Sequence, residues 1–189
     1  MKKNVARKRD LLRAARAAGT LVRVTRTVEE SWAEGYVAGV AEDLFLLCLV
    51  SDDVVFDGFQ AFRLADVVDV ASPAPHAQFV ERALHLRGQA RPADPAVDLG
   101  DLRTLLTSAC QAFPMITLHR EVADPDVCHI GVVEGFAREA VTLREVDADA
   151  GWVAERGVYA LGEVTRVDFG GRYAEALALV AAAGAPATG

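Results

Sequence analysis

The sequence lacks any apolar stretch long enough to cross a membrane, and its N-terminus lacks the apolar core of a signal peptide. The longest apolar run, Leu44–Val50, has seven residues, whereas a membrane-spanning helix needs about 20. A hydrophobic share of 52% with 25% charged residues is typical of a globular protein with a well-formed core. We therefore expect a cytoplasmic protein that does not contact a membrane.

Cysteine is scarce, and the motifs that mark common enzyme classes are missing. Cys48, Cys110 and Cys128 are odd in number and widely spaced, without a C-x-x-C pair, which favours reduced thiols over a disulfide framework. The chain has no G-x-S-x-G, no P-loop and no G-x-G-x-x-G motif, so nucleophilic-serine, nucleotide and dinucleotide chemistry have no support. The sequence thus predicts no catalytic residue and no cofactor, and it favours a binding protein over an enzyme.

Positive charge is concentrated at the N-terminus. The first 16 residues hold seven Lys and Arg against one acid, Asp10, whereas the remaining residues carry 13 basic and 26 acidic side chains. So acidic a body repels polyanions, and only the N-terminal arm supplies the clustered cations that RNA binding requires. We interpret this arm as the solvated face of a helix, with RNA binding through the arm as the alternative.

The hydrophobic pattern predicts short strands framed by helices. Helices are expected over residues 4–18, 76–87, 99–113 and 172–183, and strands over 20–28, 32–41, 44–50, 59–64, 67–71 and 115–122. Gly35 and Gly39 indicate a bulge or bend in the second strand. The third strand is apolar at every position, which predicts cover on both of its faces. Residues 51–58 form an acidic loop, and the tail 184–189 is expected to be disordered.

The stretch 36–70 returns with the same pattern at 130–169. The clearest match aligns residues 62–70, FRLADVVDV, with residues 159–167, YALGEVTRV. Both follow the rule aromatic, x, Leu, x, acid, Val, x, x, Val. This similarity indicates an internal repeat, in which each unit is a helix followed by five bent strands.

Paired units of this kind resemble tandem Sm-like proteins, whose fold is a small SH3-like barrel; the chain is also similar to uncharacterised bacterial proteins of this shape. The resemblance covers about residues 5–72 and 99–170. It implies a mainly β protein with flanking helices (α+β), built from two closed five-stranded barrels. The expected domains are 1–88 and 99–189, joined by a linker at 89–98 that contains two prolines.

The resemblance also implies RNA binding through loops that contain Asn and basic residues, commonly in ring assemblies. This chain departs from that pattern, because its corresponding loops are acidic and its single Asn is Asn4. We therefore expect a non-catalytic binding or assembly module that contacts protein partners or itself. The contacts would use the barrel edges and the unequal loops, by strand-to-strand pairing between the two units or between chains. The candidate binding residues are Asp52, Asp53, Asp57, Phe59, Trp32, Trp152 and Arg156.

A metal site or an enzyme site in the segment 119–129 is the remaining alternative. His119, Cys128 and His129 are metal-ligand types within eleven residues, but Cys128 and His129 point to opposite faces of a strand, and no regular ligand spacing exists. The favoured interpretation places His119, Arg120 and Glu121 on an exposed strand and packs Cys128 inward.

Overall fold

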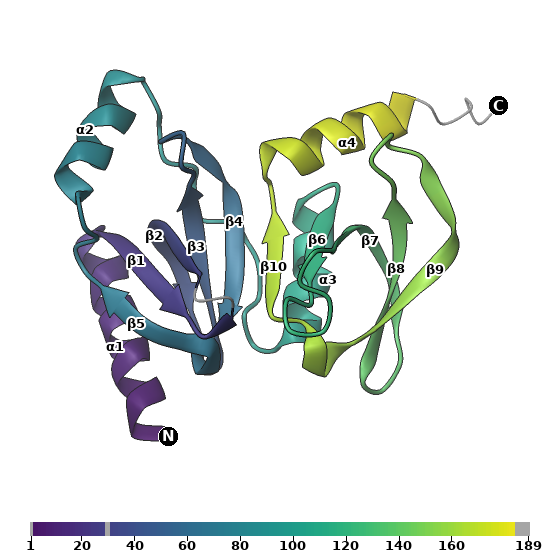
Figure 1. Cartoon of the computed structure of the whole chain (residues 1–189), viewed down its shortest axis with the longest axis horizontal. Coiled ribbons are helices and arrows are strands. Elements are labelled where there is room, and N and C mark those ends of the chain that lie inside the picture. The colour runs from purple at the N-terminus through teal and green to yellow at the C-terminus, as the bar shows by residue number, and fades with distance from the viewer. Residues whose placement is uncertain (1, 29–30, 184–189) are drawn as a thin grey trace.

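The computed structural model describes residues 2–28 and 31–183 (Figure 1). The expected disorder of the tail 184–189 falls outside this part of the chain. The α-helices are α1 (Lys2–Ala18), α2 (Ala77–Leu86), α3 (Leu102–Ala112) and α4 (Arg172–Ala183). The strands of the first half are β1 (Leu21–Arg26), β2 (Trp32–Val40), β3 (Leu44–Val50), β4 (Phe56–Arg63) and β5 (Val67–Ala71). Those of the second half are β6 (Ile116–His119), β7 (Cys128–Phe136), β8 (Ala140–Val146), β9 (Trp152–Ala160) and β10 (Arg166–Phe169).

The strands form one open antiparallel sheet of ten strands in the order β5-β1-β2-β3-β4-β10-β6-β7-β8-β9 (Figure 1). The prediction of two closed five-stranded barrels is therefore wrong. Closure would require β4 to pair with β5 and β9 to pair with β10, whereas β4 pairs with β10 across the middle of the chain. The mainly β character with flanking helices is confirmed.

The bulge predicted in the second strand lies beside Gly39, and the second half has one at the matching place. The β2–β3 ladder shifts register between Val37 and Gly39, and the β7–β8 ladder shifts between Val133 and Gly135. A Cβ on Gly35 would lie 2.3 Å from the carbonyl oxygen of Cys48, so only glycine fits there. The bulges curl each half of the sheet. They do not determine whether the last strand of a half pairs within that half or with the other half.

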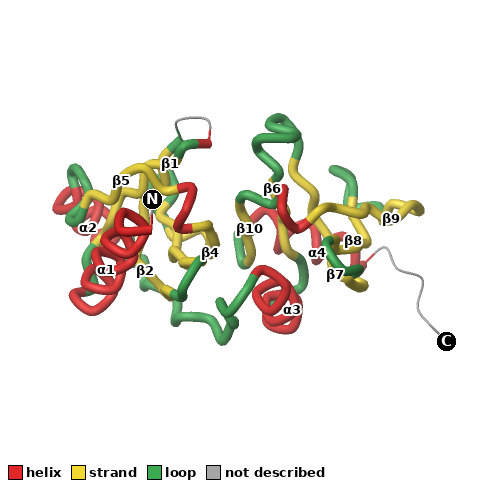
Figure 2. The backbone as a smooth tube through the Cα atoms, turned by 90° about the horizontal axis from the view of Figure 1, so that it is seen from below, coloured by secondary structure: helices red, strands yellow, loops and turns green. Residues whose placement is uncertain are grey.

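Strand β3 is covered on both faces, as its continuous apolar run predicts. Phe45 and Leu47 belong to a buried cluster with Leu12 of α1, while Leu46 and Cys48 belong to a second cluster with α3. The second cluster also contains residues of β6, β8 and β10, so it is shared by the two halves. Figure 2 shows the connection before α3 running from the first half to the second along one side of the molecule.

The helix ends follow local chemistry. α1 ends at Ala18 and is followed by Gly19, whose φ of +62° is the left-handed conformation that glycine favours. α3 begins after Asp101, whose carboxylate accepts a hydrogen bond from the Thr104 backbone N–H at 2.7 Å, and the Asp101 backbone N–H donates to the Thr104 hydroxyl at 2.9 Å in return.

The strand β6 is shorter than the predicted range 115–122. It ends at His119 because the backbone N–H groups of Ala123 and Asp124 bond the carbonyl of Arg120 and close a turn. None of the helices in the described part of the chain is long and apolar enough to span a bilayer.

Candidate functional site

The junction between the halves is a four-residue ladder of β4 and β10. Phe59 lies opposite Phe169, and their rings stack with centroids 6.0 Å apart. One position along, Gln60 lies opposite Asp168, and its amide donates to the Asp168 carboxylate at 3.2 Å. An internal strand pairing with matched apolar and polar pairs therefore joins the two halves.

Beside this ladder, His119 is held by its neighbours in the second half. Its Nε2 lies 3.0 Å from Oδ2 of Asp168, and an Arg166 guanidinium nitrogen lies 3.0 Å from both ring nitrogens. These contacts place His119 in a polar cluster with Asp168 and Arg166 beside the junction.

A buried ion cluster connects β1 to the turn after β6. Arg26, of which 2% is exposed, donates to both carboxylate oxygens of Glu121, at 3.0 and 2.5 Å. Arg166 and Thr165 donate to the same carboxylate. Burial alone would raise the pKa of Glu121, but these hydrogen bonds and cations outweigh it and lower the pKa to about 2. The interpretation of Glu121 as an exposed residue is therefore wrong.

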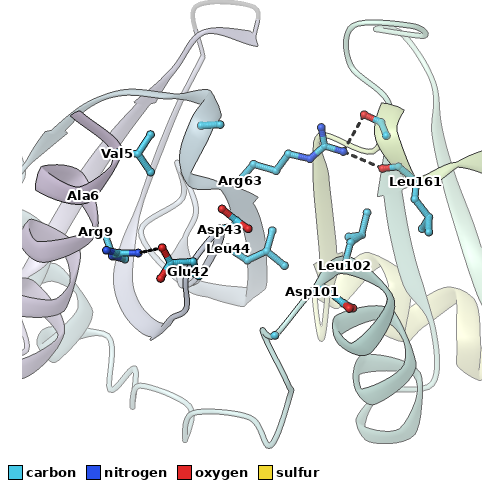
Figure 3. Close-up of a pocket in the computed structure, with 13 residues that line it drawn as sticks. Val5, Ala6, Arg9, Glu42, Asp43, Leu44, Arg63, Asp101, Leu102 and Leu161 are labelled. Carbon is cyan, nitrogen blue, oxygen red and sulfur yellow. Dashed lines mark hydrogen bonds and ion pairs between the residues drawn. The ribbon is translucent and has the colours of Figure 1, made fainter. Parts of the chain in front are cut away.

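A groove of about 800 Å³ opens between the halves next to the junction (Figure 3). Arg63 reaches across it from β4, and its Nη2 donates to the carbonyls of Leu161 and Gly162 at 2.8 and 2.9 Å. The apolar lining comes from both halves, namely Val5, Ala6, Leu44, Ala65, Leu102 and Leu161. The acidic lining is Glu42, Asp43 and Asp101.

Both ends of the sheet leave a strand edge without a partner strand in the described part of the chain. β5 pairs with β1 alone, and β9 pairs with β8 alone. Val68 on β5 and Val158 on β9 are apolar residues with 51% and 64% of their surface exposed. Unpaired N–H and C=O groups along such an edge are a template for another strand.

The basic N-terminal segment is a docked helix. Within α1, Arg9 contacts Glu42 at 2.5 Å and Arg16 contacts Asp94 at 3.2 Å, while Lys8 donates to the Val67 carbonyl. Carboxylates of the body therefore neutralise part of the charge that an RNA-binding arm would need.

The acidic residues and the phenylalanine predicted from the sequence as binding-loop residues lie in different environments. Asp52 and Asp53 are exposed in the turn between β3 and β4. Asp57 lies on β4 and accepts a hydrogen bond from the Arg172 backbone N–H at 2.9 Å, which ties the start of α4 to the first half. Phe59 is buried at the junction and is a core residue.

The predicted aromatic and basic candidates lie on strands. Trp32 of β2 is half exposed, with the Arg23 guanidinium 4.2 Å above its ring. Trp152 begins β9 and packs under α4. Arg156, also on β9, contacts Glu134 at 2.5 Å. These residues do not converge with the acidic loop on one site.

The metal alternative gains no support from the geometry. His119 and Cys128 lie opposite each other in the β6–β7 ladder, but His129 points to the other face. Among the residues that the structure describes, no three His, Cys, Asp or Glu side chains are grouped to hold a metal ion. Cys128 is exposed, so the expectation that it packs inward is also wrong.

His129 instead belongs to a polar trio that sequence reasoning missed. The Tyr159 hydroxyl donates to Glu145 at 2.6 Å and lies 2.8 Å from Nδ1 of His129. Burial first, and then the hydrogen bond to Glu145, raise the pKa of Tyr159. The trio joins three adjacent strands, β7, β8 and β9. The sequence carried a signal for it, because β8 contains polar residues whereas the corresponding strand of the first half, β3, is apolar.

Fold and site together define a protein with an open antiparallel sheet, an internal junction of paired strands and a groove beside it. The chain matches none of the protein-family models, curated proteins or solved structures with which it was compared.

Proposed function

We propose that this protein is a non-catalytic assembly module that joins copies of itself through the free strand edges at the two ends of its sheet. The observation that supports this proposal is the position that each edge strand has within its half. Inside the chain, the fourth strand of the first half pairs with the fifth strand of the second half. The two free edges are the fifth strand of the first half, β5, and the fourth strand of the second half, β9.

The two ends of one chain are therefore of the same two kinds that pair at its centre. Pairing β9 of one copy with β5 of the next would repeat the internal junction between molecules. Such an interface is head-to-tail, so it produces a closed ring if the rotation closes and an open chain if it does not. The exposed Val68 and Val158 provide apolar side chains on these two strands.

A common origin of the two halves as copies of one Sm-like unit forms part of this proposal. Each half has the pairing order fifth-first-second-third-fourth. Val54 and Ala150, both in the turn before the fourth strand, adopt positive φ angles of 54° and 62°. Such a conformation is uncommon for residues other than glycine, so its occurrence at matching places supports the duplication.

Light scattering of the purified full-length chain over a concentration series tests the assembly. We expect a mass above that of one chain, and we expect Val158→Lys or Val68→Lys to shift it toward the monomer, because a lysine on an edge strand opposes pairing. Leu179→Lys on α4 is the matched control, since Leu179 is an exposed apolar residue on a helix and not on either edge strand. A wild-type chain that stays monomeric throughout the series contradicts the proposal.

A further inference from the structure

We infer that the groove between the halves binds a small organic cation with an aliphatic chain. The groove is lined by Val5, Leu44, Leu102 and Leu161 among others, and its volume of about 800 Å³ lies within the range of small-molecule sites. An apolar floor with a few polar groups at its rim is the arrangement that orients an amphipathic ligand. This inference does not depend on the proposed assembly.

The sign of the ligand's charge follows from which lining groups already have partners. Arg9 contacts Glu42, and Arg63 donates to two backbone carbonyls. Asp101 caps the N-terminus of α3 by accepting a hydrogen bond from the Thr104 backbone N–H, so a carboxylate already lies where an anion would bind. The donors of both arginines are therefore engaged, but carbonyls do not cancel the charge of Arg63. The lining holds two positive charges, Arg9 and Arg63, against the three carboxylates of Glu42, Asp43 and Asp101, which leaves it net negative.

The negative groups are not balanced. Glu42 is paired with Arg9, but the Asp43 carboxylate has no hydrogen-bond or ion-pair partner among the described residues. The carboxylate of Asp101 accepts hydrogen bonds within its own capping box but faces no cation in a salt bridge within that same part of the chain. Hydrogen bonding by the Thr104 N–H lowers the pKa of Asp101, so this group stays ionised at neutral pH.

Asp43 and Asp101 stand on opposite sides of the groove, one in the turn between β2 and β3 and the other at the start of α3 (Figure 3). A cationic head between them meets negative charge from both halves, while the aliphatic part of the ligand covers the leucines. An aliphatic carboxylate of the same length meets the same floor but is repelled by the rim. Charge, rather than shape, should therefore discriminate among ligands.

Three probes with the same six-carbon chain test this: hexylamine, hexanol and hexanoate, titrated into the full-length protein by calorimetry. We expect saturable binding of hexylamine, weaker binding of hexanol and none of hexanoate. Methylamine should bind more weakly than hexylamine, because it cannot cover the apolar floor. Added salt should weaken hexylamine binding.

Asp43→Asn should weaken hexylamine binding about fivefold, as expected for one partly exposed charge pair. Asp149→Asn, an exposed acid in the turn between β8 and β9, is the control and should change nothing. The thermal midpoint of Asp43→Asn should equal that of the wild type, since the Asp43 side chain makes no hydrogen bond within the described residues.

Equal affinities for hexylamine and hexanol overturn the inference, as does an Asp43→Asn variant that binds hexylamine like the control. Absence of saturable hexylamine binding to the wild type also overturns it. Repeating the titration on Val158→Lys separates this result from the assembly, because binding counted per chain does not require the free edges.

Discussion

At the scale of single residues, Glu121 shows how a side chain acquires its role from distant parts of the chain. Its carboxylate accepts hydrogen bonds from Arg26, 95 residues earlier, and from Thr165 and Arg166, more than 40 residues later. No local pattern marks such a residue, because a charged residue after a short strand is normally exposed. Its burial is decided where the turn after β6 meets the end of β1.

Replacing Glu121 should reveal the cost of leaving Arg26 buried without a counter-charge. We expect Glu121→Gln to lower the free energy of unfolding by about 3 kcal/mol, measured by urea denaturation. Glu139→Gln is the control, because Glu139 is exposed and its contact with Arg138 is 3.8 Å long, so it should cost less than about 0.5 kcal/mol.

A double variant tests the pairing itself. Arg26→Met combined with Glu121→Gln should lower the free energy of unfolding by less than the sum of the two single losses. Full additivity would argue against the pairing.

The same carboxylate should make stability depend on pH. The pKa of Glu121 is lowered from 4.5 to about 2 in the folded chain, so the unfolded chain takes up the proton first as pH falls. The stabilisation from Glu121 is therefore complete above pH 4.5 and is lost as pH falls toward 2. Urea denaturation at several pH values should show a shallower decline across this window for Glu121→Gln than for the wild type. Parallel curves would show that other carboxylates cause the decline.

At the scale of elements, sequence periodicity predicts the helices and most strands. It does not predict where the backbones of the two halves come into contact. The predicted ranges 4–18 and 172–183 correspond closely to α1 and α4, because a helix is set by contacts within a few residues. β4 begins at Phe56, earlier than the predicted 59. The strand therefore includes Gly58, whose backbone lies against Gly170, just before α4.

Gly58 should tolerate no side chain. Its φ is +74°, and a Cβ there would lie 2.5 Å from the carbonyl carbon of Gly170. Gly88 has a similar φ of +64° but open space around it, so Gly88→Ala should cost only the conformational strain, about 1 kcal/mol. We expect Gly58→Ala to lower the unfolding free energy clearly further in the same urea assay. Equal losses of unfolding free energy for the two variants would mean that the contact between Gly58 and Gly170 gives way at little cost.

At the scale of the whole molecule, one buried cluster includes strands of both halves and α3 between them. A chain whose halves share a core should unfold in one transition. The two tryptophans offer a direct test, because Trp32 lies in the first half and Trp152 in the second.

Single-tryptophan variants, Trp152→Phe and Trp32→Phe, should report the two halves separately by fluorescence. Within each variant, we expect the fluorescence midpoint in urea to coincide with the midpoint measured by circular dichroism, which follows the whole chain. A fluorescence midpoint that departs from the circular dichroism midpoint would show that the halves unfold independently and that the shared cluster contributes little.

The sequence by itself determined the kind and order of the elements, the bulge beside Gly39, and the cover on both faces of β3. These features depend on neighbours within a few residues or on alternation along one strand. Only the tertiary structure decided that β4 pairs with β10, that the sheet stays open, and that a groove forms beside the junction. The physical reason is that the backbone N–H and C=O groups along one strand edge are the same as those along another, so local sequence does not specify which edges meet. Long-range contacts such as the Phe59–Phe169 stack and the Arg26–Glu121 pair join the halves.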